Sequence, residues 1–182
     1  LHFGFISTNS LELKLAITLA AKYDERIIVE QNIEKALEIE CAVLGNNNPH
    51  ASVLGQIVAS NEFYDYDAKY VNGKSQAIIP APLPKRISTL IQKLAVQAFV
   101  ALDLAGMSRV DFLVSRDLKH IYLNEVNTIP GFTSISMYPK LWEVSGLLYP
   151  QLLSRLIQLA MERHAARAKL NTSFKPKKLW YQ

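Results

Sequence analysis

The sequence contains a single cysteine and no long apolar run among its 182 residues. Because Cys41 has no second cysteine to pair with, the chain cannot form an internal disulfide, which is typical of a protein in a reducing compartment. No apolar segment approaches the roughly 18 residues that cross a bilayer, and the N-terminus lacks a signal-peptide pattern. We therefore predict a cytoplasmic location and no membrane association.

Acidic residues are missing from the C-terminal end of the sequence. Residues 164–182 contain no Asp or Glu and five basic side chains: Arg167, Lys169, Lys175, Lys177 and Lys178. A basic tail can bind nucleic acid or a membrane surface, but residues 169–182 show little apolar periodicity, which favours a solvated tail. The formal charge is +4. Without the tail the chain is close to neutral, so we expect no nucleic-acid binding.

The composition is that of a globular protein, with 49% hydrophobic and 20% charged residues. Apolar periodicity predicts helices over residues 11–23, 85–102 and 149–167, with Ser10 as the N-cap of the first and Pro150 in the first turn of the last. The apolar face of the middle helix is expected to contain Ile87, Leu90, Ile91, Leu94, Ala95, Ala98 and Leu102.

Short apolar runs predict strands over residues 26–30, 38–45, 51–59, 108–114 and 120–126, with a tight turn at 46–49. Residues 61–83 are rich in tyrosine and run into three prolines at positions 80, 82 and 84, which indicates a long irregular loop with a functional role. The fold class predicted from these elements is α+β, with strands in hairpins and helices packed on one face of the sheet.

The segments SRVDFLV and IYLNEVN carry the most informative polar residues. In a strand, residues two apart share a face. If the two strands form a hairpin that pairs Asp111 with Glu125, the same register pairs Arg109 with Asn127 and brings all four side chains to one face. A register slip of one residue breaks this arrangement.

Two carboxylates and an amide oxygen are the ligands that Mg²⁺ prefers, and Mg²⁺ is usually shared with substrate phosphates. An arginine beside them can stabilise charge on a phosphoryl group or an oxyanion. The alternative is a structural ion pair on a solvated sheet face, and the residues alone leave both interpretations open. The loop TIPGFTSISMYP follows directly. It contains Gly131, the hydroxyl side chains of Thr133, Ser134 and Ser136, and Pro139 opening a short helix, which is typical of an anion site.

The motifs RVDFLV, YLNEVNTIPGFTSISMYPKLWE and FYDYDAKY resemble those of the D-alanine–D-alanine ligases, over about residues 6–164. The resemblance implies an ATP-grasp fold: a C-terminal catalytic domain (antiparallel sheet with flanking helices) over residues 34–168, a remnant of the central subdomain over 1–33, and the basic tail. The implied reaction uses ATP to phosphorylate one D-alanine, and the amine of a second D-alanine then attacks the acyl phosphate to give D-alanyl-D-alanine for peptidoglycan.

The resemblance also implies roles for individual residues. Asp111, Glu125 and Asn127 match ligands of two Mg²⁺ ions, with Mn²⁺ possible as a substitute. Arg109 and the backbone of Gly131 match groups that stabilise the tetrahedral intermediate. The second D-alanine matches a site formed by Ser136 and the backbone of Met137.

The residues that match the ATP site are spread over the first half of the chain. The adenine edge is expected to be read by Glu30, Asn32 and Ile33, and the ribose by Glu38. Three more matches lie in the tyrosine-rich loop, which is expected to close over the site: Phe63 against the adenine, Lys69 on a phosphate and Tyr70 beside the second substrate.

The sequence does not contain matches to two parts of a complete ligase. One is the N-terminal domain, with the glutamate that orients the first D-alanine, and the other is a KPxxxGSS phosphate-binding segment. We therefore expect the chain alone to be inactive, and the complete enzyme to be a homodimer. Two alternatives stay open: a non-catalytic ATP-grasp remnant that acts as an interaction module, and a sister carboxylate–amine ligase with another second substrate.

Overall fold

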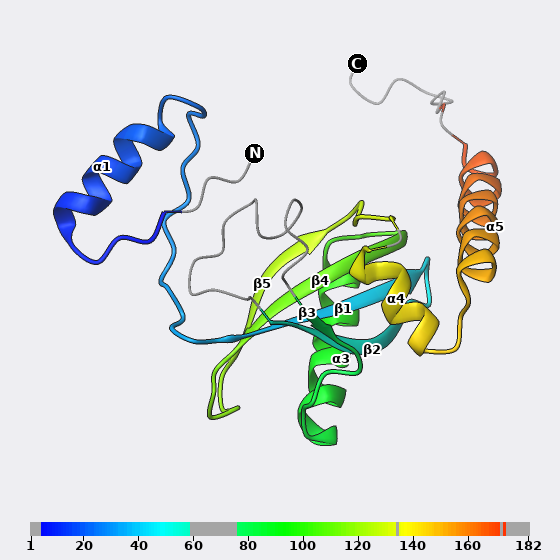
Figure 1. Cartoon of the computed structure of the whole chain (residues 1–182). Helices are drawn as coiled ribbons and strands as arrows, with labels where there is room; N and C mark the ends of the chain where they lie inside the picture. The colour runs from blue at the N-terminus through cyan, green and yellow to red at the C-terminus, as the bar shows by residue number, and fades with distance from the viewer. Residues whose placement is uncertain (1–4, 59–75, 134, 172, 174–182) are drawn as a thin grey trace, which may run out of the picture. The chain divides into compact units, whose positions relative to one another are not determined.

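The computed structural model describes residues 5–58, 76–133, 135–171 and 173. The chain divides into two compact units that meet in the sequence between Lys35 and Ala36. The first unit contains helix α1 (Ser10–Ala20), and the second contains the sheet and the other helices (Figure 1).

The first unit differs from the sequence prediction in two details. The N-cap of α1 is Asn9, whose side chain accepts a hydrogen bond from the N–H of Glu12 at 3.0 Å, so the prediction of Ser10 is wrong by one residue. The predicted strand over residues 26–30 is also wrong, because this segment has no regular structure. A strand needs a neighbour to accept its backbone hydrogen bonds, and residues 5–35 contain no second strand.

The second unit is built on a five-stranded sheet. Its strands are β1 (Leu37–Gly45), β2 (His50–Val58), β3 (Gln76–Ile78), β4 (Gly106–Val114) and β5 (Ile121–Asn127). They lie in the order β3-β2-β1-β4-β5, and every neighbouring pair is antiparallel. The four strands predicted within this unit are confirmed, whereas β3 lies inside a stretch that was expected to be irregular.

The tight turn predicted at residues 46–49 joins β1 to β2. Gly45 has a φ of +145°, and a Cβ atom at this position would lie 2.7 Å from the Cα of Pro49. Only glycine fits this close approach, so the turn fixes where β1 ends.

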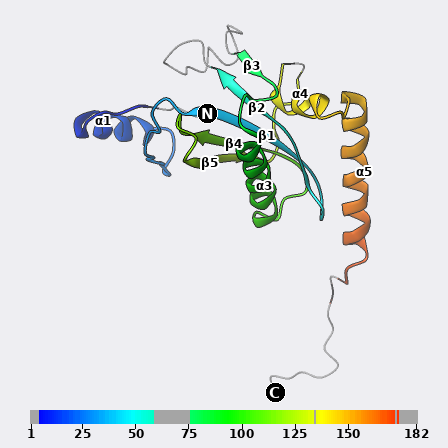
Figure 2. The same ribbon diagram turned by 90° about the horizontal axis from the view of Figure 1, so that it is seen from below.

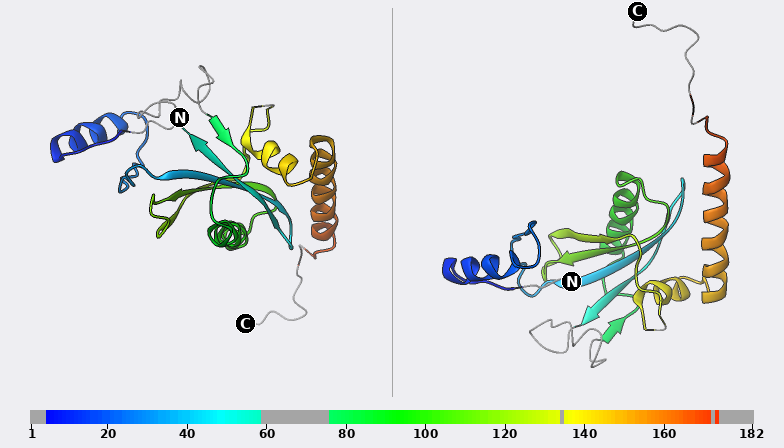
Figure 3. Two further views of the ribbon diagram at one scale, coloured as in Figure 1. Left: turned by 60° about the horizontal axis from the view of Figure 1, so that its bottom comes forward. Right: turned by 90° about the horizontal axis from the view of Figure 1, so that it is seen from above.

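Helices cover both faces of the sheet, so the expectation of one covered face is wrong. Helix α3 (Lys85–Ala101) lies on one face, and α4 (Met137–Val144) lies on the other, with α5 (Tyr149–Ala168) packed against α4 (Figures 2 and 3). The reason is visible in β1, whose residues are all buried from Ile39 to Gly45. A strand that is buried on both sides has an almost continuous apolar sequence, as residues 41–45 (CAVLG) do.

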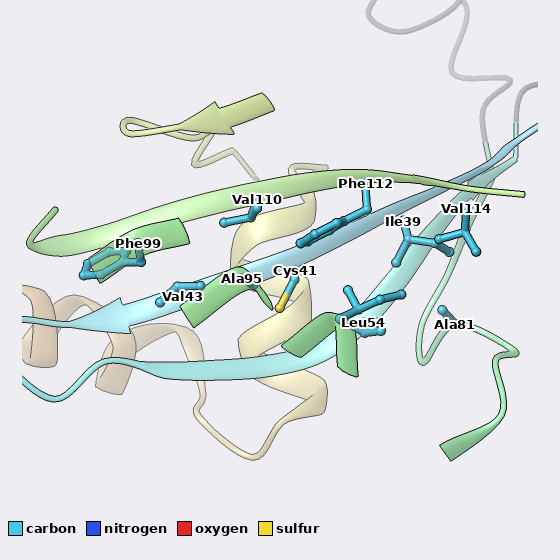
Figure 4. Packing of buried hydrophobic residues seen from close by; sticks show 11 residues of the cluster. Ile39, Cys41, Val43, Leu54, Ala81, Ala95, Phe99, Val110, Phe112 and Val114 are labelled. Carbon is cyan, nitrogen blue, oxygen red and sulfur yellow. The ribbon is translucent and has the colours of Figure 1, made fainter. Parts of the chain in front are cut away.

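The core on the α3 face is apolar throughout. Figure 4 shows side chains of β1, β2, β4 and α3 meeting between sheet and helix, and the fully buried members include Ile39, Val43, Ile91, Phe99, Val110 and Val114. Burying each large side chain contributes roughly 1.5–3 kcal/mol. Phe99 was missing from the predicted apolar face, while Leu90 and Leu102, which were included, are 43% and 56% exposed.

A second apolar cluster fixes α4 on the opposite face. Tyr138, Leu141 and Trp142 of α4 pack with Ala42 and Leu44 of β1, and the helix is further covered by Leu152 and Leu159 of α5. The hydroxyl of Tyr138 donates a hydrogen bond to the carbonyl of Val43 at 3.0 Å. These contacts hold the first turn of α4 against the same sheet face that carries Arg109 and Asp111.

Candidate functional site

The register of the β4–β5 hairpin confirms the sequence prediction. Asp111 pairs with Glu125, and Arg109 pairs with Asn127. Beyond Asp111 the register shifts, because Phe112 pairs with Leu123 and leaves Asn124 as an extra residue in β5. This β-bulge lies directly beside the carboxylates, where bulges often redirect side chains.

Arg109 is the centre of a buried charge cluster. Its Nε and Nη2 atoms donate to the two carboxylate oxygens of Asp111 at 2.8 and 2.7 Å. On the other side of β4, Nε lies 3.1 Å from Oε2 of Glu40 in β1. The side chains of Arg109, Asp111 and Glu40 are only 17%, 14% and 10% exposed. The ion pair of the structural alternative is therefore present, but it is buried rather than solvated.

Sequence reasoning missed Glu40 as a site residue. Glu40 pairs with Asp111 across β1 and β4, and it shares the strand face of Glu38. The signal was available in EIECAVLG, because Glu38 and Glu40 are two residues apart in a strand that is otherwise apolar. A charged residue that interrupts such a strand indicates either a paired charge or a functional group.

The electrostatics of the cluster follow from burial and close contact. Burial raises the pKa of Asp111, Arg109 opposes this, and the nearby Glu125 raises it further, so the net direction is upward. Burial lowers the pKa of Arg109, but its hydrogen bond to Asp111 and the charges of Glu40, Asp111 and Glu125 raise it by more. Arg109 therefore stays protonated. Its single positive charge interacts with three carboxylates, those of Glu40, Asp111 and Glu125.

The arrangement of Asn127 shows that the oxygen atoms of this cluster fit a cation. Its side-chain N–H₂ group donates to Asp111 at 3.0 Å and to Glu125 at 3.2 Å, so one donor bridges both carboxylates. A 180° turn of this amide exchanges its nitrogen for its oxygen, which gives a set of three oxygen ligands. Within the described residues no group of three or more His, Cys, Asp or Glu is placed to hold a metal. Two carboxylates and one amide oxygen are ligand types that Mg²⁺ accepts when water or substrate phosphates supply the others.

A cavity of about 200 Å³ opens beside this cluster. It is lined by Glu38, Glu40, Asp111, Asn124 and Glu125, together with the strand residues between them. Glu38, the predicted ribose ligand, therefore lies at the same cavity as two of the predicted metal ligands.

The loop before α4 holds a second group of polar residues. The hydroxyl of Ser136 accepts a hydrogen bond from the N–H of Thr133 and lies 2.9 Å from the Thr133 hydroxyl. A Cβ atom on Gly131 would lie 2.9 Å from this Ser136 oxygen, so a larger residue at position 131 would displace the Ser136 hydroxyl. Helix α4 begins at Met137, and its N-cap Ser136 makes no side-chain capping hydrogen bond.

The remaining predicted site residues lie elsewhere. Glu30, Asn32 and Ile33 belong to the first unit, in a segment without regular structure, where Ile33 is half-buried and the other two are exposed. The last three predicted residues, Phe63, Lys69 and Tyr70, lie outside the described residues. Among the helices of the described ranges, none has the length and hydropathy that crossing a bilayer requires.

The antiparallel sheet, the helices on its two faces and the carboxylate hairpin are those of an ATP-grasp C-terminal domain. The family model described as "D-ala D-ala ligase C-terminus" matches residues 4–158. Since this match covers most of the sequence, the chain belongs to the D-alanine–D-alanine ligase C-terminal family.

Known relatives agree with this assignment. A D-alanine–D-alanine ligase from Thermoanaerobacter sp. (strain X514) is 60% identical over 157 residues, which cover 86% of this chain and 44% of the relative. The structure of the D-alanine–D-alanine ligase from Coxiella burnetii superimposes with a TM-score of 0.80 at 40% identity, covering 91% of this chain and 43% of that one. The ligase from Bacillus anthracis complexed with ATP gives a TM-score of 0.72 at 26% identity, covering 87% and 50%. The chain thus spans half or less of the length of these relatives.

Proposed function

We propose that this chain provides the metal–ATP region and the second-substrate region of a D-alanine–D-alanine ligase. The observation that carries the proposal is the hairpin register, which brings Arg109, Asp111, Glu125 and Asn127 to one sheet face beside a cavity. The family match and the ATP-bound relative support it. The cytoplasmic location and the homodimeric state of a complete enzyme stay predictions.

In the proposed site, Asp111, Glu125 and Asn127 hold two Mg²⁺ ions, or Mn²⁺ in their place. When bound, such ions neutralise charge on ATP phosphates during phosphoryl transfer. Glu38 binds the ribose. We further propose that Glu30, Asn32 and Ile33 read the adenine edge, and that Phe63 and Lys69 bind the adenine face and a phosphate.

The guanidinium of Arg109 then donates to the oxyanion that forms when the amine of the second D-alanine attacks the acyl phosphate. Its raised pKa keeps it cationic, and its burial strengthens its interaction with a developing charge. The backbone N–H of Gly131 is the second donor. Ser136 and the N–H of Met137 bind the carboxylate of the second D-alanine at the start of α4, and Tyr70 positions that substrate.

A hybrid enzyme tests this proposal. In the Thermoanaerobacter ligase, the 157 aligned residues are replaced by those of this chain. We expect the hybrid to release ADP in a reaction that depends on both D-alanine and Mg²⁺. A hybrid that folds and binds D-alanine but releases no ADP would contradict the proposal, with the parent ligase as the positive control.

A further inference from the structure

Glu40 has no part in the function proposed above, yet it contacts the central arginine of the site. Two carboxylates contact Arg109, one from the neighbouring strand β1 and one from its own strand β4. Glu40 comes from β1, with Oε2 at 3.1 Å from Nε of Arg109. Asp111 comes from β4 itself and binds Nε and Nη2.

Asp111 is involved in several interactions at once. Oδ1 and Oδ2 both accept from Arg109, and Oδ2 also accepts from Asn127 at 3.0 Å. A carboxylate oxygen that binds a cation has less electron density to share with a guanidinium. The Asp111–Arg109 contact therefore competes with metal binding, whereas Glu40 contacts the same Nε atom of Arg109 from another strand.

We propose that Glu40 is a positioning residue that holds the guanidinium of Arg109 in place while Asp111 binds the metal ion; this rests on the proposed function. The contacts with Asp111 and Glu40 engage Nε and Nη2. An Arg109 side chain held by Glu40 therefore keeps its position even when its bonds to Asp111 lengthen.

Two other roles for Glu40 give different experimental results. As a purely structural acid, Glu40 only offsets the buried charge of Arg109, and its removal lowers stability without any link to metal binding. As a third metal ligand, its removal lowers metal affinity. The positioning role predicts that Arg109 loses its fixed position only when metal is bound.

The first test uses NMR of the full 182-residue chain, with the Nε–H signal of Arg109 assigned through Arg109→Lys. The probe is Mg²⁺ added in the presence of a non-hydrolysable ATP analogue, with the analogue alone as the reference, and the side-chain amide of Asn127 reports its binding. We expect Mg²⁺ to move the Asn127 signal in both the wild type and Glu40→Gln. The Arg109 signal should stay sharp in the wild type and broaden in the variant. Glu143→Gln, an exposed change of the same type on α4, serves as the control.

Each outcome of this titration decides one point. If Mg²⁺ leaves Asn127 unmoved in the wild type, the proposed metal site fails. If Asn127 moves but Arg109 responds identically in the wild type and Glu40→Gln, the positioning role of Glu40 is overturned. If Glu40→Gln abolishes the Asn127 response, Glu40 is a metal ligand and the proposal is likewise overturned.

The second test measures kinetics in the hybrid ligase. Glu40→Gln should lower kcat about tenfold to a hundredfold, the effect of losing one close ion pair in the site, with the KM for ATP changed by less than roughly threefold. Glu40→Asp keeps the charge and should lower kcat by roughly threefold to tenfold, which gives a result even if Glu40→Gln fails to fold. An active hybrid whose kcat is unchanged by Glu40→Asp and by any folded Glu40→Gln overturns the inference, whereas an inactive wild-type hybrid overturns the proposed function instead.

Discussion

The two faces of the five-stranded sheet are formed by the same strands but have different properties. Along β4, Val110, Phe112 and Val114 point to α3 and are at most 1% exposed. The alternate residues Arg109 and Asp111 point to the other face, where α4 covers only the apolar part near Ala42 and Leu44. One strand thus supplies a sealed core on one side and a charged cavity on the other. Stability and chemistry can therefore be perturbed separately, one face at a time.

The largest expected effect concerns the charged face. In the hybrid ligase, Glu125→Gln should lower Mg²⁺-dependent ADP release on the order of a thousandfold, because a metal ligand stabilises the transition state by several kcal/mol. The melting temperature should fall little or rise, since the change removes a like charge beside Asp111. A steady-state ADP assay and a thermal melt measure the two effects, with Glu143→Gln as the control. Unchanged turnover would refute the metal assignment.

The α3 face should show the opposite behaviour. Phe99→Ala removes a fully buried ring and should lower the free energy of unfolding by about 3–5 kcal/mol. The neighbouring change Val100→Ala, at a residue that is 59% exposed, should cost within about 0.5 kcal/mol. Urea unfolding of the 182-residue chain measures both. Equal costs at the two positions would show that α3 is packed differently from the structure described here.

The pH dependence of stability tests whether Cys41 is buried on the α3 face. Burial raises the pKa of its thiol to about 12 from an ordinary value of 9.0. The unfolded chain therefore loses this proton first as pH rises. The contribution of the buried, protonated thiol to the free energy of unfolding is complete below pH 9 and declines by about 1.4 kcal/mol per pH unit toward pH 12. We expect the wild type to lose stability between pH 9 and 11 relative to Cys41→Ala. If the free energies of unfolding of the two chains changed equally with pH, the burial of Cys41 would be contradicted.

The smallest effect is expected at the loop before α4. Thr133→Val removes the hydroxyl that lies 2.9 Å from the hydroxyl of Ser136. The KM for the second D-alanine in the hybrid should rise roughly fivefold, because one neutral hydrogen bond contributes about 1 kcal/mol. Thr89→Val, an exposed change on α3, is the matched control. Equal KM values for the two variants would show that the Thr133–Ser136 contact has no role in binding the second D-alanine.

Much of this sheet could be predicted from the sequence because side-chain alternation has a strict period of two. The β4–β5 register followed from one assumed pair, and the structure has that register around Asp111. The bulge at Asn124 could not be predicted in this way, since an extra residue leaves the alternation of β4 unchanged. Strand β3 is only three residues long, too short for a periodic signal.

The site was predictable in part for the same reason. Residues on one hairpin could be placed together from local spacing, but Glu40 lies about seventy positions before Asp111, and its pairing depends on strand order. Sequence spacing within one hairpin contains no information about which strand lies on the other side of β4. The wrong prediction of helices on one face has the same origin, because cover on a second face is a tertiary property.

The metal assignment is tested most directly by a crystal structure of the hybrid ligase with Mn²⁺ and a non-hydrolysable ATP analogue. The anomalous signal of manganese locates the ion without reference to any chemical assumption. We expect an anomalous peak within coordination distance of Asp111, Glu125 and Asn127, next to the nucleotide phosphates. A bound nucleotide whose manganese lies away from these three side chains would contradict the account of the charged face.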